Sequence, residues 1–462
     1  MSATTTAGVI AARLDRLPRA RHVWWLITLI SLGACFELYD LFLTAYVVPG
    51  MARHGLFTRE SLGIFGILEP LHVTGPGTFV FALFAGLFVG TIAFGWLADA
   101  YGRRFVFTFS LLWYSAATLV MALQTTGFGV DLWRFIAGIG IGVELVTIDT
   151  YVSELIPRHE RGQAFAFSQF VGFSAVPVVA FLAWALGPDN WRWVVAIGAA
   201  GALVVWWLRR ELPESPRWLA RHGRYAEAEA IMAGIEAKVS AETGPLPAPK
   251  AGIAAAEEEG RSSFAELWQP PYVSRTILLS VFNFFQTFGY YGFAAWVPTL
   301  LIAKGITVTT SLGYAFIIAI ANPIGPLLGA LVADRMERKW QICLAATGIA
   351  VFGLAFAAQS AAIPLIVCGV LVTLCNNWLS FAFHNYQAEL FPTRVRARAV
   401  GFVYAWSRLS AALSGLAVAV FLGLGGVMAV FLFIAVSMVI VVATIGGFGP
   451  RTRGLALEAI SS

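Results

Sequence analysis

The sequence predicts an all-helical integral membrane protein with twelve transmembrane helices, arranged as two homologous bundles of six. Three observations predict this fold class. Apolar and aromatic residues make up 58% of the 462 residues, and charged residues only 12%, about half their share in soluble proteins. Twelve apolar runs are long enough to cross a bilayer, and two motifs recur at one fixed spacing. A soluble protein of this composition would aggregate through exposed apolar patches, so a soluble enzyme is excluded.

The twelve runs each have the length of about 20 residues that a helix needs to cross a hydrocarbon core of about 30 Å. They are apolar on every side, whereas barrel strands would be about 10 residues long with alternating polarity. The first run is too long for the apolar part of a signal peptide, so we take it as a span. The predicted spans are 23–49, 77–98, 105–125, 131–153, 163–187, 191–209, 275–303, 310–333, 340–359, 362–384, 398–422 and 426–448.

The distribution of Lys and Arg predicts the orientation, because loops on the cytoplasmic side are enriched in these residues. With the N-terminus inside, the inner segments hold 25 of them and the outer loops only 4. We therefore expect both termini in the cytoplasm. The predicted organisation is a cytoplasmic tail (1–22), an N-terminal bundle (23–209), a cytoplasmic linker with short amphipathic helices (210–274), a C-terminal bundle (275–448) and a cytoplasmic tail (449–462).

Two motifs occur once in each half of the chain. The segment Asp99-Ala-Tyr-Gly-Arg-Arg has a counterpart at Asp334-Arg-Met-Glu-Arg-Lys, which lies 235 residues later. The pattern Tyr151-x-x-Glu-x-x-Pro-x-x-x-Arg recurs from Tyr386 at the same offset of 235. Two different motifs at one offset indicate that the halves arose by duplication.

These motifs resemble the signatures of the major facilitator superfamily over nearly the whole chain. Gly95-Trp-Leu-Ala-Asp-x-x-Gly-Arg-Arg resembles its motif between helices two and three, and Arg134-x-x-x-Gly-x-Gly-x-Gly its helix-four motif. Pro213-Glu-Ser-Pro-Arg-Trp-Leu resembles the branch of sugar porters, organic anion and cation transporters and niacin transporters. The resemblance implies a transporter that works by alternating access, and not an enzyme. The seventh span lacks the Gln-Gln pair of sugar porters, and Glu337 stands where the first motif copy has Gly102.

The charged motif residues lie at the inner ends of the spans and predict ion pairs between helices. Such pairs can hold the inner mouth closed and break when it opens. We expect Asp99 to pair with Arg103, Glu154 with Arg161, and Glu214 with Arg217, with their counterparts in the second half. The alternative is that these charges only set topology and solvate the helix ends. The gate candidates are Asp99, Arg103, Glu154, Arg161, Glu214, Arg217, Asp334, Arg338, Glu389 and Arg396.

Charges within spans are costly and usually have both a partner and a function. Glu37 and Asp40 lie three residues apart in the first span, and Arg134 and Glu144 lie in the fourth. In the branch that the motifs resemble, an aspartate of helix one pairs with an arginine of helix four and exchanges the proton. Asp40 and Arg134 match these positions, and a carboxylate that loses its arginine takes up a proton. We predict a proton-coupling site of Asp40, Glu37, Arg134 and Glu144; the alternative is a purely structural ion pair.

Arg408, in the eleventh span, resembles the helix-eleven arginine that attracts substrate carboxylates in organic anion transporters. No acidic residue lies within spans seven to twelve above the inner motifs, and a guanidinium group favours a carboxylate ligand. The alternative is a pair with Glu37 or Glu144 across a central cavity.

Aromatic rings and amides in spans seven and ten predict cavity walls for a small planar ligand. The alternative is that the rings face lipid and the amides join helices. The binding candidates, besides Arg408, are Asn283, Gln286, Tyr290, Tyr291, Asn376, Asn377 and Trp378.

Together these observations predict a secondary transporter that imports a small organic anion with protons, such as the aromatic monocarboxylates nicotinate or benzoate. We expect no metal, no cofactor other than the coupling proton, and no nucleic-acid partner. The glycine-rich segment of the fourth span has no Walker lysine and serves close helix packing. We expect a monomer in a bacterial inner membrane. The alternatives are a sugar or organic cation transporter, and a non-transporting receptor or scaffold.

Overall fold

The computed structural model describes residues 3–71, 73, 75–94, 96–157, 159–249, 264–332, 336–391 and 393–452. Every regular element in these ranges is a helix. A helix satisfies its backbone hydrogen bonds internally, which a segment surrounded by lipid needs.

All twelve predicted spans are present, and the predicted fold class is confirmed. The first six are α2 (Arg21–Arg53), α4 (Gly75–Phe94), α6 (Arg103–Ala122), α7 (Gly127–Leu155), α8 (Arg161–Phe173) with α9 (Ala175–Leu186), and α10 (Trp191–Leu208). The last six are α13 (Tyr272–Ala294) with α14 (Val297–Ala303), α15 (Val308–Ala319) with α16 (Ile324–Val332), α17 (Arg338–Ala358), α18 (Ala362–Glu389), and two spans within α19 (Thr393–Phe448). The backbone of α19 leaves the helical conformation at Gly425 and Gly426, which separates these two spans.

The seventh span is the least apolar of the twelve. Ten helices among the described residues are long and apolar enough to cross a membrane, and α19 supplies two spans within one of them. The helix missing from that set is α13, because Asn283 and Gln286 interrupt its apolar sequence. A span that keeps buried amides contains groups with a task other than contact with lipid.

The remaining helices are short and lie at the two ends of the bundles. Between α2 and α4 are α3 (Arg59–Leu62) and the 3-10 helix η1 (Gly63–Leu71). At the opposite end are α1 (Ala3–Asp15), α5 (Leu97–Tyr101), η3 (Arg209–Glu211), α11 (Pro216–Arg221), α12 (Tyr225–Thr243) and η5 (Phe264–Trp268), while η2 (Pro188–Asn190) precedes α10. We call the end with α1, α11 and α12 the inner end and the opposite one the outer end.

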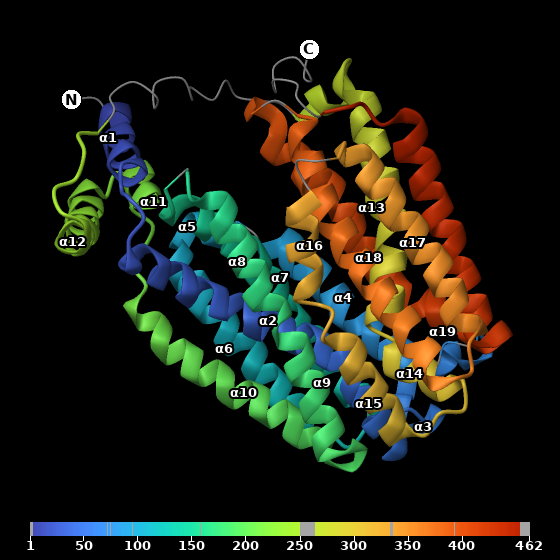
Figure 1. Ribbon diagram of the computed structural model, residues 1–462. Coiled ribbons are helices and arrows are strands. Elements are labelled where there is room, and N and C mark those ends of the chain that lie inside the picture. Colours follow the sequence, from blue (N-terminus) through green and yellow to red (C-terminus); the bar gives the residue numbers. More distant parts are fainter. Residues whose placement is uncertain are drawn as a thin grey trace.

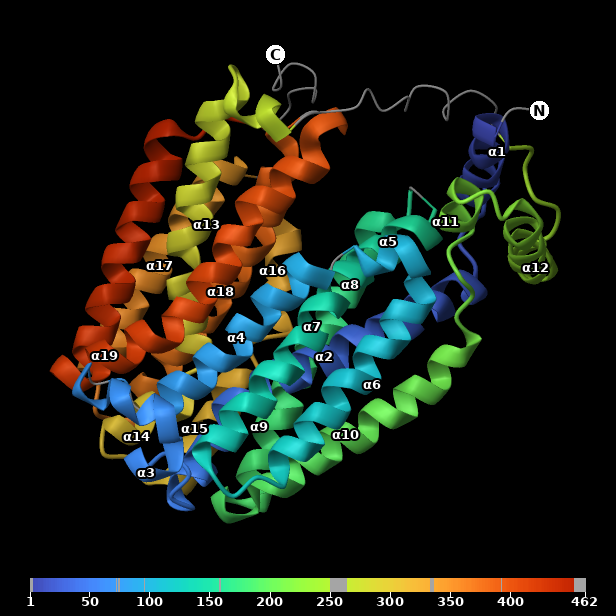
Figure 2. The same cartoon turned by 180° about the vertical axis from the view of Figure 1, so that it is seen from behind.

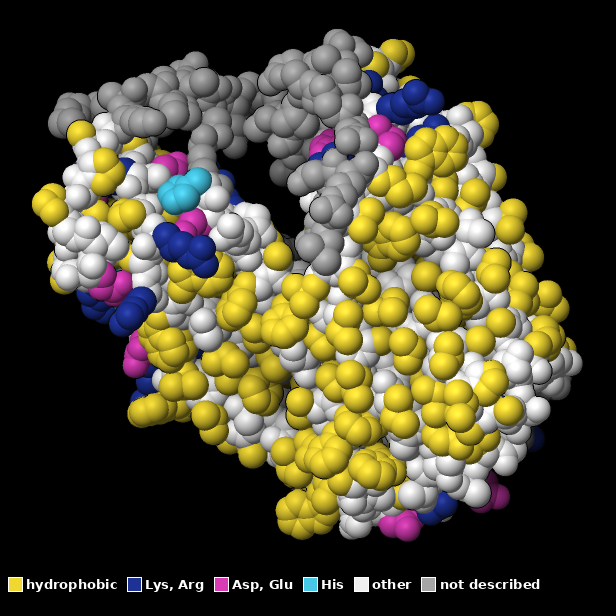
Figure 3. Space-filling model, in the orientation of Figure 1, with side chains coloured by type: hydrophobic (Ala, Val, Ile, Leu, Met, Phe, Trp, Pro, Cys, Tyr) yellow, Lys and Arg dark blue, Asp and Glu magenta, His cyan; other side chains and the backbone are white. Residues whose placement is uncertain are grey.

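The two halves meet at the outer end, near α3, α14 and α15, and diverge toward the inner end (Figure 1, Figure 2). Across this interface α4 packs on α19, and α9 packs on α15. Figure 3 shows the surface hollowed between the halves at the inner end, with apolar side chains covering their flanks. The structure is therefore open on the side that carries α11 and α12.

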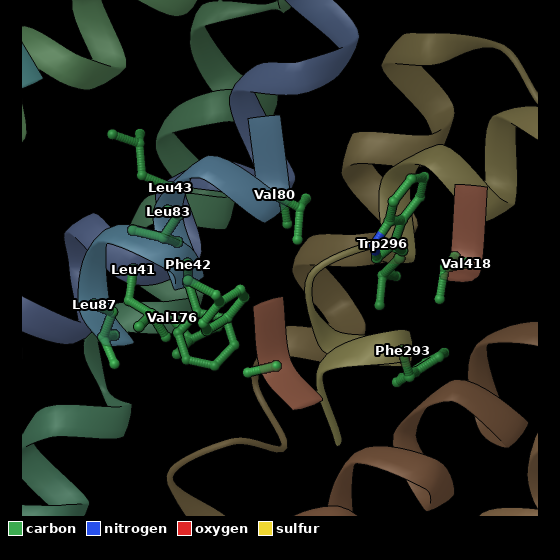
Figure 4. Packing of buried hydrophobic residues seen from close by; sticks show 14 of the residues in the cluster. Leu41, Phe42, Leu43, Val80, Leu83, Leu87, Val176, Phe293, Trp296 and Val418 are labelled. Carbon is green, nitrogen blue, oxygen red and sulfur yellow. The ribbon is translucent and has the colours of Figure 1, made fainter. Parts of the chain in front are cut away.

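One apolar cluster extends through both halves and closes the outer end. Figure 4 shows Phe42 and Val80 of the first half in the same cluster as Trp296 and Val418 of the second. The ring of Trp184 stacks on that of Phe316 with centroids 5.9 Å apart. These contacts exclude water from the outer end of the interface.

Glycines in α4 and α7 bring these two helices into backbone contact. A β-carbon added to Gly138 would lie 2.3 Å from the carbonyl oxygen of Leu83, and one added to Gly86 would lie 2.1 Å from that of Phe135. The glycine-rich segment of the fourth span therefore serves close helix packing, as predicted.

The N-terminal segment is more structured than the predicted tail, because α1 packs on α11 and α12. Ile10 and Leu14 of α1 are buried in an apolar cluster with Met232 and Ile235 of α12. Arg13 of α1 forms ion pairs with Glu229 and Glu236 of α12, at 2.5 and 2.6 Å. The first helix and the linker thus form one helical layer at the inner end of the N-terminal half.

Candidate functional site

Asp40 of α2 and Arg134 of α7 form a buried ion pair in the N-terminal half. Their side chains are joined by Nη1 of Arg134 and Oδ2 of Asp40 at 3.0 Å. Arg134 also donates from Nε to the hydroxyl of Thr44 at 3.1 Å and from Nη2 to the backbone carbonyl of Asp40. Its guanidinium lies over the ring of Phe79, 5.6 Å from the centroid. The pair predicted from the sequence is thus brought together and shielded from solvent.

Glu144 has a cation of its own, Arg209, which is the last residue of the predicted sixth span and which the sequence did not identify as its partner. Arg209, only 1% exposed, reaches from the end of α10 to Glu144, with Nη2 and Oε1 2.6 Å apart. The guanidinium of Arg209 lies 3.5 Å from the ring centroid of Phe107 and donates to its carbonyl oxygen at 2.6 Å. Ser110 also donates to Glu144, at 3.3 Å. The geometry of Glu144 is therefore that of a structural ion pair separate from Asp40 and Arg134.

Glu37 is buried, with 2% of its surface exposed, and lies one turn before Asp40 on α2. Tyr291, from the other half, lies within electrostatic range of both Glu37 and Arg408.

A small cavity of about 20 Å³ lies between the halves at the outer end of the hollow, room for about one water molecule. The first half contributes Phe42, Tyr46 and Val176 to its wall, and the second contributes residues from α13 to α18 that include Tyr290, Thr373 and Asn376. Asn376 is only 2% exposed, and neither its amide nitrogen nor its amide oxygen has a hydrogen-bond partner. A buried amide without partners is costly, so this side chain is suited to bind a ligand.

Asn377 of α18 lies beside Asn376 and joins α13 to the turn between α15 and α16, around the same cavity. It donates from Nδ2 to the backbone carbonyl of Asn322 at 3.1 Å and accepts at Oδ1 from the hydroxyl of Tyr290 at 3.2 Å. Asn322 also lines the cavity, and the sequence interpretation missed it, although an amide between the apolar segments of the eighth span was a usable signal.

The other predicted binding residues are distributed more widely. Gln286 donates to Thr287 at 2.8 Å, and Asn283 donates to the carbonyl of Leu279 at 2.9 Å, with Gln387 of α18 at 3.5 Å. Trp378 donates to Gln341 of α17 at 3.3 Å and is absent from the residues that line the cavity.

The aromatic candidates lie closer to the interface between the halves. The ring centroid of Tyr291 is 4.4 Å from that of Phe84 in α4. Arg408, 8% exposed, lies over the ring of Tyr404 at 4.7 Å.

The charged motif at the inner end of the N-terminal half is centred on Arg103. Its guanidinium pairs with Asp99 at 2.8 Å and with Glu154 at 3.0 Å. Glu214 accepts from the backbone N–H groups of Arg103 at 2.9 Å and Arg104 at 3.2 Å, at the start of α6. Burial raises the pKa of the Glu214 carboxyl, and the backbone hydrogen bonds oppose that rise.

Two of the three expected gate pairs take other partners in this structure. Glu154 pairs with Arg103 and, at 3.9 Å, with Arg221 instead of the expected Arg161. Arg217 pairs with Asp15 of α1 at 2.7 Å instead of Glu214. Arg161 donates to the carbonyl of Ile156 at 3.3 Å.

The C-terminal half has the counterpart of the Arg103 pair. Arg338 and Glu389 are 3.0 Å apart, and they lie 235 residues after Arg103 and Glu154. Asp334 and the side chain of Arg396 lie outside the described residues. Each of these pairs joins helices of the same half, so at the open inner end each half is held together separately.

Within the described ranges, no group of three or more His, Cys, Asp or Glu side chains has a geometry that could hold a metal ion.

Comparisons with known proteins identify transporters as relatives of this chain. The model of a family described as "Sugar (and other) transporter" matches residues 26–462. A putative metabolite transport protein of Bacillus subtilis, YyaJ, is 33% identical over 453 residues, covering 96% of each chain. The niacin transporter NiaP of Acinetobacter baylyi is 26% identical over 453 residues, covering 98% of this chain and 99% of that protein.

Among solved structures, an inward-open conformation of the xylose transporter XylE from E. coli superposes with a TM-score of 0.75. Its sequence is 19% identical, and the match covers 95% of this chain and 99% of that one.

Proposed function

The chain belongs to the sugar (and other) transporter family, within the major facilitator superfamily, and from that premise we propose that it imports a small organic anion with protons. It is a multi-pass membrane protein, and its relatives are transporters. We further propose that it acts as a monomer, with both termini in the cytoplasm of a bacterial cell and the proton as its coupling ion. Inner membrane transport proteins of E. coli among its relatives support that location.

The observation that carries the proposal of coupling is the buried pair of Asp40 and Arg134. The pair lies on α2 and α7, at a point that the outer apolar cluster separates from the outside. A carboxylate in that position is ionised while Arg134 neutralises it, and it binds a proton when the arginine moves away. Motion of α2 against α7 during the transport cycle would therefore load and release one proton.

The inner clusters support alternating access by rocking of the two halves. The Arg103–Glu154 pair ties α6 to α7, and the Arg338–Glu389 pair ties α17 to α18. Each half then moves as a rigid unit while the inner end opens. Closure of the inner end brings the charged clusters of the two halves toward each other, and a gate would act at this meeting point.

Arg408 supports an anionic substrate. Its guanidinium lies at the interface between the halves, near Tyr291 and over the ring of Tyr404. A guanidinium beside aromatic rings suits a planar carboxylate, which can form two hydrogen bonds and stack. Niacin, named for the Acinetobacter relative, is an aromatic monocarboxylate of this kind.

A sugar is the second candidate, favoured by the amides around the cavity. Asn322, Asn376 and Asn377 provide donors and acceptors close together, as a substrate with several hydroxyl groups requires. The two candidates differ in their need for Arg408, since a neutral sugar has no charge for it to balance.

Uptake of radiolabelled nicotinate into proteoliposomes with an acidic exterior tests the proposal. We expect accumulation that a protonophore abolishes and that excess benzoate, but neither glucose nor choline, competes away. Competition by glucose would favour the sugar. Absence of uptake with folded protein would remove nicotinate and leave other carboxylates, sugars and cations to be assayed in the same way.

A further inference from the structure

A second buried carboxyl, Asp131, lies near the outer end of α7 and has no role in the site described above. It is 1% exposed, and neither of its oxygens has a hydrogen-bond partner. α7 begins at Gly127, so Asp131 lies about 6 Å along the helix axis from the outer end, and Arg134 about 4.5 Å deeper. The backbone N–H of Gly127 donates to Ser61 at 2.7 Å, so the segment between α2 and α4 adjoins this end of the helix.

A neighbouring hydroxyl group can act as an acceptor for Asp131. Thr78 of α4 lies beside it, and the Thr78 hydroxyl donates its single proton to the carbonyl of Gly75 at 3.0 Å. The lone pairs of that hydroxyl oxygen remain for Asp131. A protonated carboxyl can donate to them, whereas an ionised one could be stabilised by Thr78 only if the hydroxyl gave up its bond to Gly75; a buried carboxyl without a donor is favoured in its neutral form.

Few other charged groups surround Asp131. On its own helix Arg134 lies one turn deeper, where its guanidinium is bound to Asp40 and Thr44 of α2. Tyr114 of α6 lies deeper, beside Gly140 of α7, and Thr78 of α4 is uncharged. Arg59 and Glu60 of α3 are exposed at the outer surface, while α8 and α11 pack on α7 nearer its inner end. The groups within one turn of helix are therefore Arg134 and, through it, Asp40.

We propose that Asp131 is a second proton-binding site, which holds a proton in this conformation and passes it toward Asp40 when the outer end opens. The inference rests on the proposed proton coupling. The O–H bond of Asp131 breaks and an O–H bond forms on Asp40, with water that enters from the outside carrying the proton between them. Asp40 becomes neutral and releases Arg134, which then neutralises the Asp131 carboxylate.

The direction of the Arg134 side chain makes this exchange of partners possible. Long side chains on a helix lean toward its N-terminus, over residues three and four positions earlier. Arg134 therefore leans toward the turn that carries Asp131, and residues spaced three apart are neighbours on the helix surface. A modest rotation of the guanidinium would exchange Asp40 for Asp131.

Infrared difference spectroscopy on the purified full-length protein tests the protonation directly. At neutral pH we expect the carbonyl band of a protonated carboxylic acid in the wild type, its loss in Asp131→Asn, and its retention in Asp40→Asn. The matched control is Asp189→Asn, which changes an exposed carboxylate in an outer loop and is expected to leave the band intact. A wild-type spectrum without a band that depends on Asp131 would overturn the proposal.

Thr78→Val provides a second route that keeps the Asp131 carboxyl in place. Loss of the hydroxyl acceptor is expected to shift the same carbonyl band to higher frequency, because the protonated acid then has no acceptor beside it to which it could donate. An unchanged band in folded Thr78→Val protein would contradict the assignment of the band to Asp131. This test remains available if the Asp131→Asn protein does not fold.

Transport then tests the relay. For Asp131→Asn we expect a shift of a unit or more in the external pH that gives half-maximal uptake. The rate of exchange of labelled for unlabelled substrate should stay within about twofold of the wild-type rate. An unshifted profile would overturn the relay. Wild-type uptake without any pH dependence would refute the proposed coupling, while the infrared result would still decide whether Asp131 binds a proton.

Discussion

The two halves share one plan of six spans but bury different chemistry. The N-terminal half buries charges: the Asp40–Arg134 pair, the Glu144–Arg209 pair and the carboxyl of Asp131. The C-terminal half buries mainly amides and rings, and Arg408 is its mid-membrane charge among the described residues. The amides are Asn283, Gln286, Asn322, Gln341, Asn376, Asn377 and Gln387.

The buried chemistry of the two halves matches at the inner ends, where Arg103–Glu154 and Arg338–Glu389 occupy equivalent positions at the same distance of 3.0 Å. Both halves need their helix ends held together when the inner mouth opens, so the same pair serves both. The proposed proton site occupies one half, and the proposed polar binding wall occupies the other. This difference matches the proposed function, with the first half moving the proton and the second recognising the substrate.

The largest effect on stability is expected from Arg209→Met. This change tests whether the Glu144–Arg209 pair of the first half has a structural role. The change leaves Glu144 buried without its cation, which costs about 3–5 kcal/mol. A large drop in the thermal midpoint of the detergent-purified protein should follow. Arg210→Met, a neighbouring exposed arginine, is the control and should have little effect. A stable Arg209→Met protein would show that Glu144 is neutral or has another partner.

Asp40→Asn tests whether the first half carries the coupling. We expect roughly tenfold or greater loss of proton-driven accumulation, because a mid-membrane carboxylate of this kind is a functional group. Exchange of labelled for unlabelled substrate, which needs no net proton movement, should persist. Asp189→Asn serves as control. If Asp40→Asn still accumulates substrate in response to a pH gradient, coupling lies elsewhere.

Asn376→Leu tests recognition by the second half. Loss of a buried hydrogen bond to substrate is worth about 1–1.5 kcal/mol, so KM for uptake should rise roughly tenfold with the pH profile unchanged. Asn385→Ala, an exposed asparagine of the same helix, should not change KM. A shift in the pH profile of Asn376→Leu would contradict the division between the halves.

The smallest effect concerns the helical layer that α1 forms on the first half. Partial burial raises the pKa of the Glu236 carboxyl, but hydrogen bonds from Arg13 and Arg16 outweigh it and leave the pKa below its ordinary value. The contribution of these pairs is therefore present above the ordinary glutamate pKa and is lost as the pH falls through the lowered value.

Partly exposed pairs of this kind are worth about 0.2–1 kcal/mol each, so Glu236→Gln should raise hydrogen exchange in α1 modestly at neutral pH. Glu227→Gln removes a local pair with Arg224 within α12 and should leave α1 protected. Equal exchange in both variants would show that Leu14 and its apolar neighbours alone hold α1.

The sequence by itself determined the fold class, the twelve spans and the duplication. Length, apolar composition and a repeated motif suffice for these, because a bilayer admits few spanning structures. The partnership of Asp40 with Arg134 was predicted from the resemblance to the transporter branch. The sequence did not determine which residues near the helix ends are buried. Arg209 is the last residue of the predicted sixth span, where a side chain can face either water or the bundle, and only the packing of α10 on α6 shows that its guanidinium lies within the bundle.

Tertiary structure alone decided which charges and amides share a site. Glu154 pairs with Arg103 instead of Arg161, and Trp378 donates to Gln341 of α17. The way in which the helices pack determines which side chains come within reach of one another. Helical periodicity gives the face on which a side chain lies, but only the packing of the other helices determines what it meets there. For the same reason Asp131, three residues before Arg134, could be identified as a buried carboxyl beside an acceptor hydroxyl only once α4 had been placed against α7.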